Sequence, residues 1–296
     1  MSRRFTNEHP CAICGGDQFE AVPSSNLSHL CKCIACKVVS VYPFPREEEV
    51  RAIYSADYFK NDASSVRGYD DYESDRENIV ETAGRRLREI ERMVPPSRLL
   101  DFGCALGFFV EEARRRGWAA QGIDISTHAV EYAKEKLGVE ARAGTLRDAD
   151  FAKQSFDVVT MWDVIEHLPD PVGELSLCRD LLRPDGLLVL STPDLDSLVA
   201  KITGPRWMGF KLADEHIYYF SRKTIRYVLD RAGFETVEIK TIGKHVTLEF
   251  FARRLSMYTP RLAAALGRAF HFAGVENLAL YVDPHDLMRV VARPKP

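Results

Sequence analysis

Four cysteines near the start of the chain stand at a spacing that suits a metal ion. They form two Cys-x-x-Cys pairs, Cys11 with Cys14 and Cys33 with Cys36, and eighteen residues separate the pairs. Each pair lets two thiolates reach one ion from a tight turn, and two pairs complete a tetrahedral set with no open position. The spacing therefore predicts a closed, structural zinc site.

A second group of residues predicts a nucleoside site. The apolar pair Leu99-Leu100 runs into Asp101-Phe102-Gly103-Cys104-Ala105-Leu106-Gly107, a glycine-rich turn of the kind that lets backbone approach a ligand closely. A dinucleotide site typically has the sequence G-x-G-x-x-G, which binds a pyrophosphate. The acid at this strand end suits a cationic ligand instead. The next strand ends at Asp124, whose carboxylate can accept hydrogen bonds from two vicinal ribose hydroxyls.

Further along the chain, Trp162–Pro169 supplies candidate acid–base groups. His167 is the first candidate general base, because an unperturbed imidazole keeps a neutral fraction near pH 7. His216 is the second candidate. Asp163, Glu166 and His167 stand at i, i+3 and i+4, which would place them on one helical face as a possible divalent-metal set. The alternatives are a histidine that satisfies backbone groups and carboxylates that are simply solvated.

These residues lie in an alternation of short apolar strands and helical patterns, which is typical of an α/β fold with a mostly parallel sheet. A helix is also expected within residues 46–94, closed by Pro95-Pro96. Strands are expected at 98–102, 119–124, 156–162, 187–191, 236–242 and 287–293, and helices near 108–116, 127–137, 172–182 and 222–232.

Three stretches carry a specific resemblance. LLDFGCALGFF, GIDIS and FDVVTMWDVIEHLPDP are similar to motifs of class I S-adenosylmethionine-dependent methyltransferases, over roughly residues 98–242. Together with the cysteine pairs and DEHIYYFSRKTIRYVLDRAGF, they resemble a bacterial subgroup with a zinc ribbon that often acts on sugars, lipids or natural products. Lys37 stands where many ribbons have glycine, and Ala105 replaces the usual middle glycine of the turn. The resemblance implies a Rossmann-like, mostly parallel seven-stranded sheet.

The resemblance also assigns roles to residues. Asp101 and Gly103 would hold the methionine end of the cofactor, Asp124 the ribose, and Ile125 and Leu146 the two faces of adenine. The segment Gly144-Thr145-Leu146 lacks the acid that many members place at the adenine amino group. The Asp163, Glu166 and His167 set resembles the divalent-metal triad of ubiquinone-pathway O-methyltransferases. The full expected cofactor set is Asp101, Gly103, Ala105, Gly107, Asp124, Ile125, Leu146, Trp162, and Tyr69 or Tyr72 closing over the carboxylate.

Composition limits the partners. The chain has 296 residues, a net charge of −3 and a pI near 6.3, so no global positive field favours nucleic acid. Residues 11–36 carry only Lys32 against Asp17 and Glu20.

No apolar run reaches the roughly 18 residues that span a bilayer, and the start lacks a secretory hydrophobic region, so a cytoplasmic protein with reduced cysteines is expected. Cys31 would then be a spare thiol.

Three regions are expected: a zinc ribbon over residues 1–45, a helical linker or cap over 46–96, and a methyltransferase domain over 97–296. A basic helical insertion at about 243–286 would form a lid, a partner surface or a homodimer contact. The expected function is O-methylation of a small or sugar-containing acceptor with a histidine base. The alternatives are an RNA methyltransferase that uses the ribbon, a metal-assisted O-methyltransferase of the ubiquinone type, and a non-catalytic scaffold.

Methylation of a nucleobase is disfavoured on two grounds. The Asn/Asp-Pro-Pro-aromatic sequence that grips a planar amine is absent after the strand that ends at Trp162. Cytosine-5 methylation needs an exposed cysteine nucleophile, whereas Cys104 lies in the glycine-rich turn and Cys178 lies inside a helical pattern.

Overall fold

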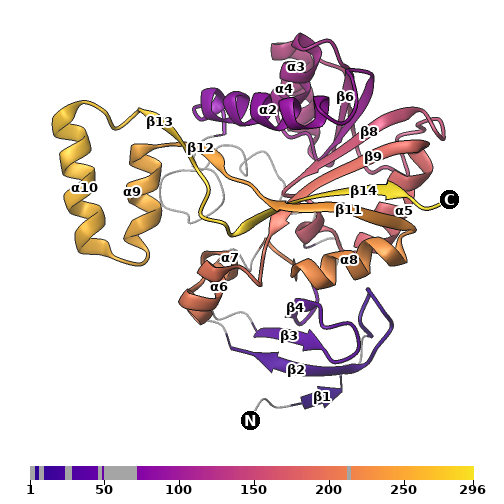
Figure 1. Ribbon diagram of the computed structural model, residues 1–296, viewed down its shortest axis with the longest axis horizontal. Coiled ribbons are helices and arrows are strands. Elements are labelled where there is room, and N and C mark those ends of the chain that lie inside the picture. Colours follow the sequence, from indigo (N-terminus) through magenta and orange to yellow (C-terminus); the bar gives the residue numbers. More distant parts are fainter. Residues whose placement is uncertain (1–3, 7–9, 24–28, 46–48, 50–71, 212–214) are drawn as a thin grey trace.

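The central feature of the computed structural model is a seven-stranded sheet (Figure 1). The structure describes residues 4–6, 10–23, 29–45, 49, 72–211 and 215–296. The strand order is β11-β14-β9-β8-β5-β6-β7, and every pairing is parallel except those of β14, which is antiparallel to both neighbours. The strands are β5 (Arg98–Phe102), β6 (Ala119–Asp124), β7 (Ala141–Ala143), β8 (Phe156–Trp162), β9 (Leu182–Pro193), β11 (Phe234–Thr241) and β14 (Leu287–Pro294).

Helices cover both faces of this sheet. Leu99 and Val158 belong to one apolar cluster with helix α2, whereas their neighbours Leu100 and Val159 belong to another cluster with α5 and α8. Side chains alternate between the faces of a strand, so strands covered on both sides need continuous apolar runs. The helices are α2 (Arg76–Glu91), α3 (Phe108–Arg115), α4 (Thr127–Leu137), α5 (Pro171–Leu181), α6 (Leu198–Thr203), α7 (Met208–Lys211) and α8 (Arg222–Arg231).

The predicted α/β class and seven-stranded sheet are confirmed, and the strands expected at 98–102, 119–124 and 156–162 have those bounds. Within residues 46–94, which were expected to be helical, α2 covers Arg76–Glu91, and residues 46–48 and 50–71 lie outside the described part of the chain.

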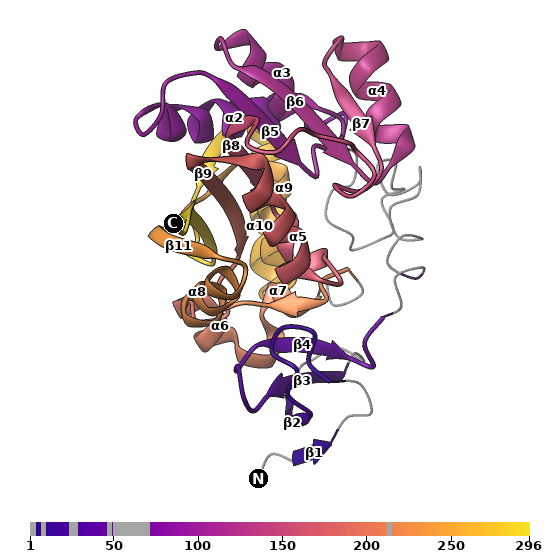
Figure 2. The ribbon, with the colours of Figure 1, turned by 90° about the vertical axis from the view of Figure 1, so that its right-hand side faces the viewer.

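The N-terminal residues form a second sheet that includes a strand from much later in the sequence. Its order is β1 (Arg4–Thr6), β2 (Gln18–Val22), β3 (His29–Cys33), β4 (Val39–Tyr42) and β10 (Tyr218–Tyr219). Tyr218 pairs with Ser40 and Tyr219 with Val39. This sheet lies at the end of the molecule away from α3 and α4 (Figure 2).

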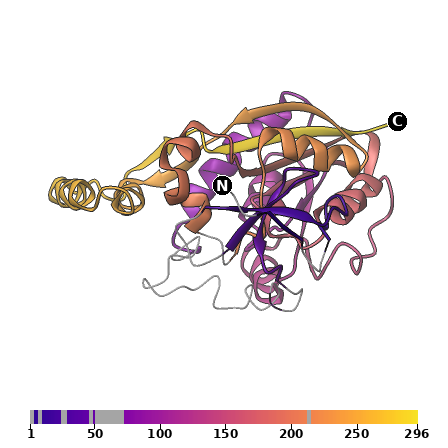
Figure 3. The same cartoon turned by 90° about the horizontal axis from the view of Figure 1, so that it is seen from below.

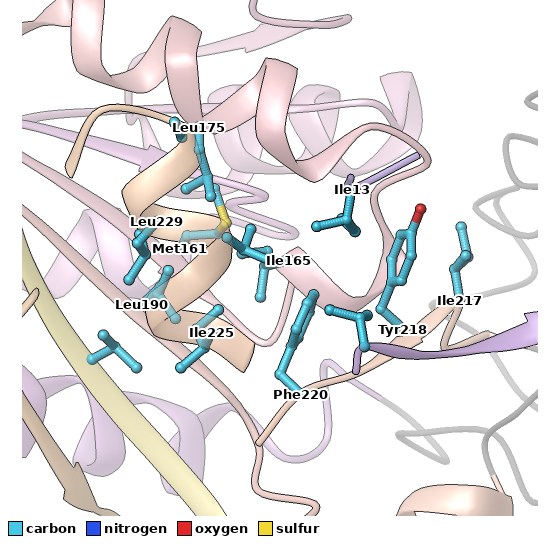
Figure 4. Packing of buried hydrophobic residues seen from close by; sticks show 14 of the residues in the cluster. Ile13, Met161, Ile165, Leu175, Leu190, Ile217, Tyr218, Phe220, Ile225 and Leu229 are labelled. Atoms are coloured by element: carbon cyan, nitrogen blue, oxygen red, sulfur yellow. The ribbon is translucent and has the colours of Figure 1, made fainter. Parts of the chain in front are cut away.

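One core runs through both sheets. Ile13 from the N-terminal sheet region and Phe220, just after β10, belong to the same buried cluster as Ile225 and Leu229 of α8 (Figure 4). Phe220 has no exposed surface. The N-terminal sheet is therefore packed on the α/β core rather than connected to it by the chain alone.

A helical arm interrupts the last two strands of the central sheet. Strands β12 (Lys244–Thr247) and β13 (Ala279–Val282) pair antiparallel at its base, and helices α9 (Leu248–Ser256) and α10 (Pro260–Ala273) extend from them. The arm projects away from the body of the molecule (Figure 3). The expected pair of helices in the insertion is confirmed, with Pro260 starting the second helix. None of the helices in the described parts of the chain has the length and apolar character needed to cross a bilayer.

The shared core makes a stability prediction. Phe220→Ala should lower the free energy of unfolding by about 3–5 kcal/mol, because it leaves a cavity between the N-terminal sheet and α8. Urea denaturation followed by circular dichroism measures the change. Ile202→Ala, at a side chain that is 75% exposed on α6, is the control and should change stability by less than about 0.5 kcal/mol. Equal effects of the two substitutions would contradict a shared core.

Candidate functional site

The turn between β5 and α3 is held in a left-handed backbone conformation. Gly103 has φ +78° and Gly107 has φ +87°. A Cβ at Gly103 would lie 2.4 Å from Val164 Cγ2, so only glycine fits there. Ala105 has φ +47°, a conformation that costs an alanine about 1–2 kcal/mol. The replacement of glycine by alanine is therefore tolerated but strained.

Asp124 secures this turn from the end of β6. Its Oδ2 accepts a hydrogen bond from the Ala105 backbone N–H at 2.8 Å, and its Oδ1 accepts one from the Ser126 N–H at 2.9 Å. The side chain is 8% exposed, and burial raises the pKa of this carboxyl. Each oxygen keeps a further lone pair for a ligand hydroxyl.

Asp101 lies at the end of β5, the strand beside β6. It is 2% exposed, and the Thr160 hydroxyl donates to its Oδ1 at 2.6 Å. Burial raises the pKa of Asp101 to about 7, although the hydrogen bond from Thr160 and the charge of Arg86 oppose the rise. A cationic partner beside this buried carboxyl would stabilise its ionised form.

The other expected cofactor residues differ in their exposure and contacts. Ile125 is 38% exposed just after β6, whereas Leu146 is 6% exposed. Tyr72 stacks on Phe108, the first residue of α3, with ring centroids 5.8 Å apart. Tyr69 lies outside the described residues.

Trp162, at the end of β8, lies under a cation. The Arg86 guanidinium carbon is 4.3 Å from the centre of the Trp162 ring. The Trp162 indole Nε1 is buried and makes no hydrogen bond with the described residues. This expected cofactor residue therefore presents a buried donor at the same sheet edge as Asp101 and Asp124.

The prediction that Asp163, Glu166 and His167 share one helical face is wrong. Asp163 has φ +57°, and the following 3-10 turn η2 covers only Ile165–His167. The Asp163 carboxylate accepts from Ser191 Oγ at 2.7 Å and pairs with Lys244 Nζ at 2.7 Å. Although burial opposes it, the charges of Lys244 and Arg86 hold the pKa of Asp163 well below its usual range. Asp163 is therefore an ionised partner of two cations.

The structure brings Glu166 and His167 to His216 instead. One ligand atom from each lies within 4.8 Å of the others, and the two imidazole centroids are 4.8 Å apart. Glu166 is 1% exposed, and the Thr192 hydroxyl lies close to its carboxyl group. Burial, followed by the charge of Asp163, raises the pKa of Glu166 to about 8.

The histidines of this cluster are neutral near pH 7. Burial lowers the pKa of His167 to about 4 and that of His216 well below its usual value. His167 Nδ1 lies 2.8 Å from the Glu215 carbonyl oxygen, which can only accept, so Nδ1 carries the proton and Nε2 is the basic nitrogen. His216 Nδ1 is buried and has no hydrogen-bond partner among the described residues. The cluster can accept a proton or hold a cation.

Two site residues were not anticipated from the sequence. Lys244 comes from β12 of the arm, and Arg86 comes from α2. In the sequence, Lys244 is only one of the basic residues of the expected insertion, and Arg86 is only one residue of an expected helix. Nothing in the spacing links either residue to Asp163, because sheet and helix packing bring them together.

The four cysteines of the two Cys-x-x-Cys pairs converge. The Sγ atoms of Cys11 and Cys36 are 3.7 Å apart, those of Cys14 and Cys33 are 3.5 Å apart, and all four lie within 4.8 Å of one another. A tetrahedral zinc ion with Zn–S bonds of about 2.3 Å needs sulfurs about 3.8 Å apart, so the set fits that ion.

Cys31 and Lys37 lie in the same part of the chain as the four cysteines. Cys31 turns away toward Ser40, with its Sγ 3.5 Å from Ser40 Oγ, and does not belong to the set of four. Lys37 has φ +67°. This is a left-handed backbone conformation, which glycine adopts more readily than other residues.

Comparison with known proteins agrees with this arrangement. A family model described as a methyltransferase domain matches residues 72–239, which is more than half of the chain. A ubiquinone biosynthesis O-methyltransferase of Cereibacter sphaeroides is 36% identical over 118 residues, covering 38% of this chain and 48% of that protein. A protein of the same name from Actinobacillus pleuropneumoniae is 34% identical over 105 residues, covering 32% of this chain and 45% of that protein. The chain thus spans about half the length of these curated relatives.

Solved structures share the fold. A methyltransferase from Archaeoglobus fulgidus aligns with a TM-score of 0.51 at 19% identity, covering 75% of this chain and 98% of that one. A structure from Bacillus halodurans aligns with a TM-score of 0.53 at 17% identity, covering 72% and 99%. The chain belongs to the methyltransferase domain family.

Proposed function

We propose that this enzyme transfers the methyl group of S-adenosylmethionine to a hydroxyl oxygen of a small or sugar-containing acceptor, with His167 as general base. The observation that carries the proposal is the buried cluster of Glu166, His167 and His216, which follows β8 at the sheet edge where β5 and β6 end. Ligands of open α/β sheets bind along this edge.

The cofactor fits the carboxylates described above. Asp101 pairs with the ammonium group of the methionine end, and Asp124 accepts from the ribose hydroxyls. Gly103 and Gly107 let the backbone approach, while Ile125 and Leu146 border the adenine. Tyr72 and Trp162 lie beside the turn, and the same role is proposed for Tyr69. The bound cofactor supplies an electrophilic methyl sulfonium, so the protein must align the acceptor and remove its proton.

The histidine cluster is suited to that proton transfer. In the proposed site the acceptor hydroxyl donates to His167 Nε2, because Nδ1 is directed at the Glu215 carbonyl. Glu166, in the same cluster, stabilises the resulting imidazolium once it ionises. His216 is the second candidate base, since its ring packs edge-on against that of His167.

A metal-assisted reaction is the second candidate. Glu166, His167 and His216 offer one carboxylate and two imidazoles at metal-ligand spacing, and the relatives in Cereibacter and Actinobacillus are named as O-methyltransferases. This donor set suits Zn²⁺, Fe²⁺ or Mn²⁺ better than Mg²⁺. A vicinal diol or catechol would complete the coordination, and the metal would lower its hydroxyl pKa.

We also propose that Cys11, Cys14, Cys33 and Cys36 bind a structural zinc ion that fixes the N-terminal sheet. The absence of disulfides among the described cysteines suits a reducing compartment such as the cytoplasm. A site of four thiolates has no open coordination position, so its role is to stabilise the fold.

The Asp101 assignment predicts a pH dependence of cofactor binding. Because the pKa of Asp101 is raised to about 7, the charged form that pairs with the cofactor ammonium becomes populated as pH rises. The affinity for S-adenosylhomocysteine should increase about eightfold between pH 6 and pH 7.5. In Asp101→Asn, calorimetry should find weaker binding with no such rise. Parallel pH curves for the two proteins would remove Asp101 from the site.

The base assignment predicts a separation of binding from turnover. His167→Gln should bind S-adenosylhomocysteine within about twofold of the wild type, yet lose roughly 10²–10⁴-fold in turnover. Turnover is measured as S-adenosylhomocysteine release with a panel of sugar nucleotides and catechols. Loss of wild-type activity in a chelator that leaves the zinc content unchanged, restored by Mn²⁺, would favour the metal-assisted reaction. Full turnover by His167→Gln would refute both the general-base mechanism and the metal-assisted mechanism.

The zinc proposal is tested by metal content. Cys33→Ser should lose the ion and destabilise the N-terminal sheet, because binding and folding of such a site are coupled. Elemental analysis of the purified protein counts zinc per chain. Cys31→Ser is the matched control and should keep one zinc ion per chain. A Cys33→Ser variant with full zinc occupancy would contradict the four-thiolate site.

A further inference from the structure

The helical arm has an apolar surface that is exposed among the described residues. In α9 and α10, which pack against each other, the fully buried residues are Ala252 and Ala263. Phe272 is 94% exposed and Leu262 is 53% exposed. Phe251, Tyr258, Leu278 and Leu280 are exposed on the same arm. Other apolar side chains of the two helices, such as Phe250 and Leu255, are half-buried, and the exposed ones form an apolar surface that a partner can cover.

The base of the arm is fixed to the body. The Thr82 hydroxyl of α2 accepts a hydrogen bond from the His245 backbone N–H at 2.9 Å. The Arg85 guanidinium carbon lies 3.9 Å from the centre of the Tyr281 ring, and Lys244 pairs with Asp163. Because these contacts hold β12 and β13, the exposed helices are presented in a defined direction (Figures 1 and 3).

The charge of the arm is opposite to that of the whole chain. Residues 248–274 carry Arg253, Arg254, Arg261 and Arg268 against Glu249, a net charge of +3, whereas the chain carries −3. A second copy packed arm against arm would bring two such charges together. An anionic lipid surface would instead accept both the arginines and the apolar side chains.

We propose that α9 and α10 bind the interface of a lipid bilayer that contains anionic lipid. The apolar side chains, led by Phe272 and Leu262, enter the boundary between headgroups and acyl chains, and the arginines contact lipid phosphates. Residues 248–274 lie outside the segment that the methyltransferase family model matches. The arm therefore adds membrane docking to the enzyme and is independent of the acceptor proposed above.

Cosedimentation of the full chain with vesicles tests this inference. The wild type should bind vesicles of phosphatidylcholine with phosphatidylglycerol, bind pure phosphatidylcholine far more weakly, and dissociate as salt increases. Arg261→Gln combined with Arg268→Gln should weaken binding about 25-fold, since each arginine near an anionic surface contributes about fivefold. Leu262→Ser with Phe272→Ser should weaken it by more than about tenfold.

Matched controls remove the same charge or surface elsewhere. Arg226→Gln with Arg231→Gln neutralises two exposed arginines of α8, and Val237→Ser removes an exposed side chain of β11. Both controls should bind vesicles like the wild type. Equal weakening by the arm and control variants would overturn the proposal, as would absence of binding to anionic vesicles. A dimer in gel filtration that only the arm variants dissociate, without vesicle binding, would show that a second copy covers the arm.

Discussion

The burial of two carboxylates at neighbouring strand ends is the constraint on which the site depends. Asp101 and Asp124 are almost fully inside the protein, where an unpaired charge is costly. Asp124 is compensated by two backbone N–H groups, and this compensation holds Ala105 in its strained conformation. Asp101 accepts a hydrogen bond from the Thr160 hydroxyl, and its pKa is raised by burial. The remaining hydrogen-bonding capacity of both carboxylates is what the proposed cationic nucleoside would use, so the same burial that strains the turn would also prepare the proposed cofactor site.

The parts of this arrangement that are contiguous in sequence were predictable. Apolar runs define β5, β6 and β8, and each has a residue of the candidate site at its last or next-to-last position. Asp101, Asp124 and Trp162 could therefore be placed at one sheet edge from the sequence. The helical face expected for Asp163 did not form, because contacts from distant parts of the chain hold this residue in another conformation. Ser191 of the adjacent strand and Lys244 of the arm bind the Asp163 carboxylate, and the backbone turns left-handed there before any helix begins.

The parts that depend on long-range packing could not be read from the chain. His216 reaches His167 because residues 217–220 cross to the N-terminal sheet, where β10 pairs with β4. Strand β10 has two residues, too few for any periodic signal. One segment thus connects the cysteine-bearing sheet to the proposed base, and the arm connects to the site through Lys244. The expected basic helices of the insertion exist, but their orientation follows from contacts of β12 and β13 with α2.

The central claim is that the cofactor lies across the ends of β5 and β6, and Asp124 tests it most directly. Titration calorimetry of S-adenosylhomocysteine into wild-type protein should give one site per chain. Asp124→Ala should lose about 1.5–3 kcal/mol of binding free energy, the scale of a hydrogen bond to a charged group. A folded Asp124→Ala protein with wild-type affinity would place the cofactor elsewhere and contradict the account.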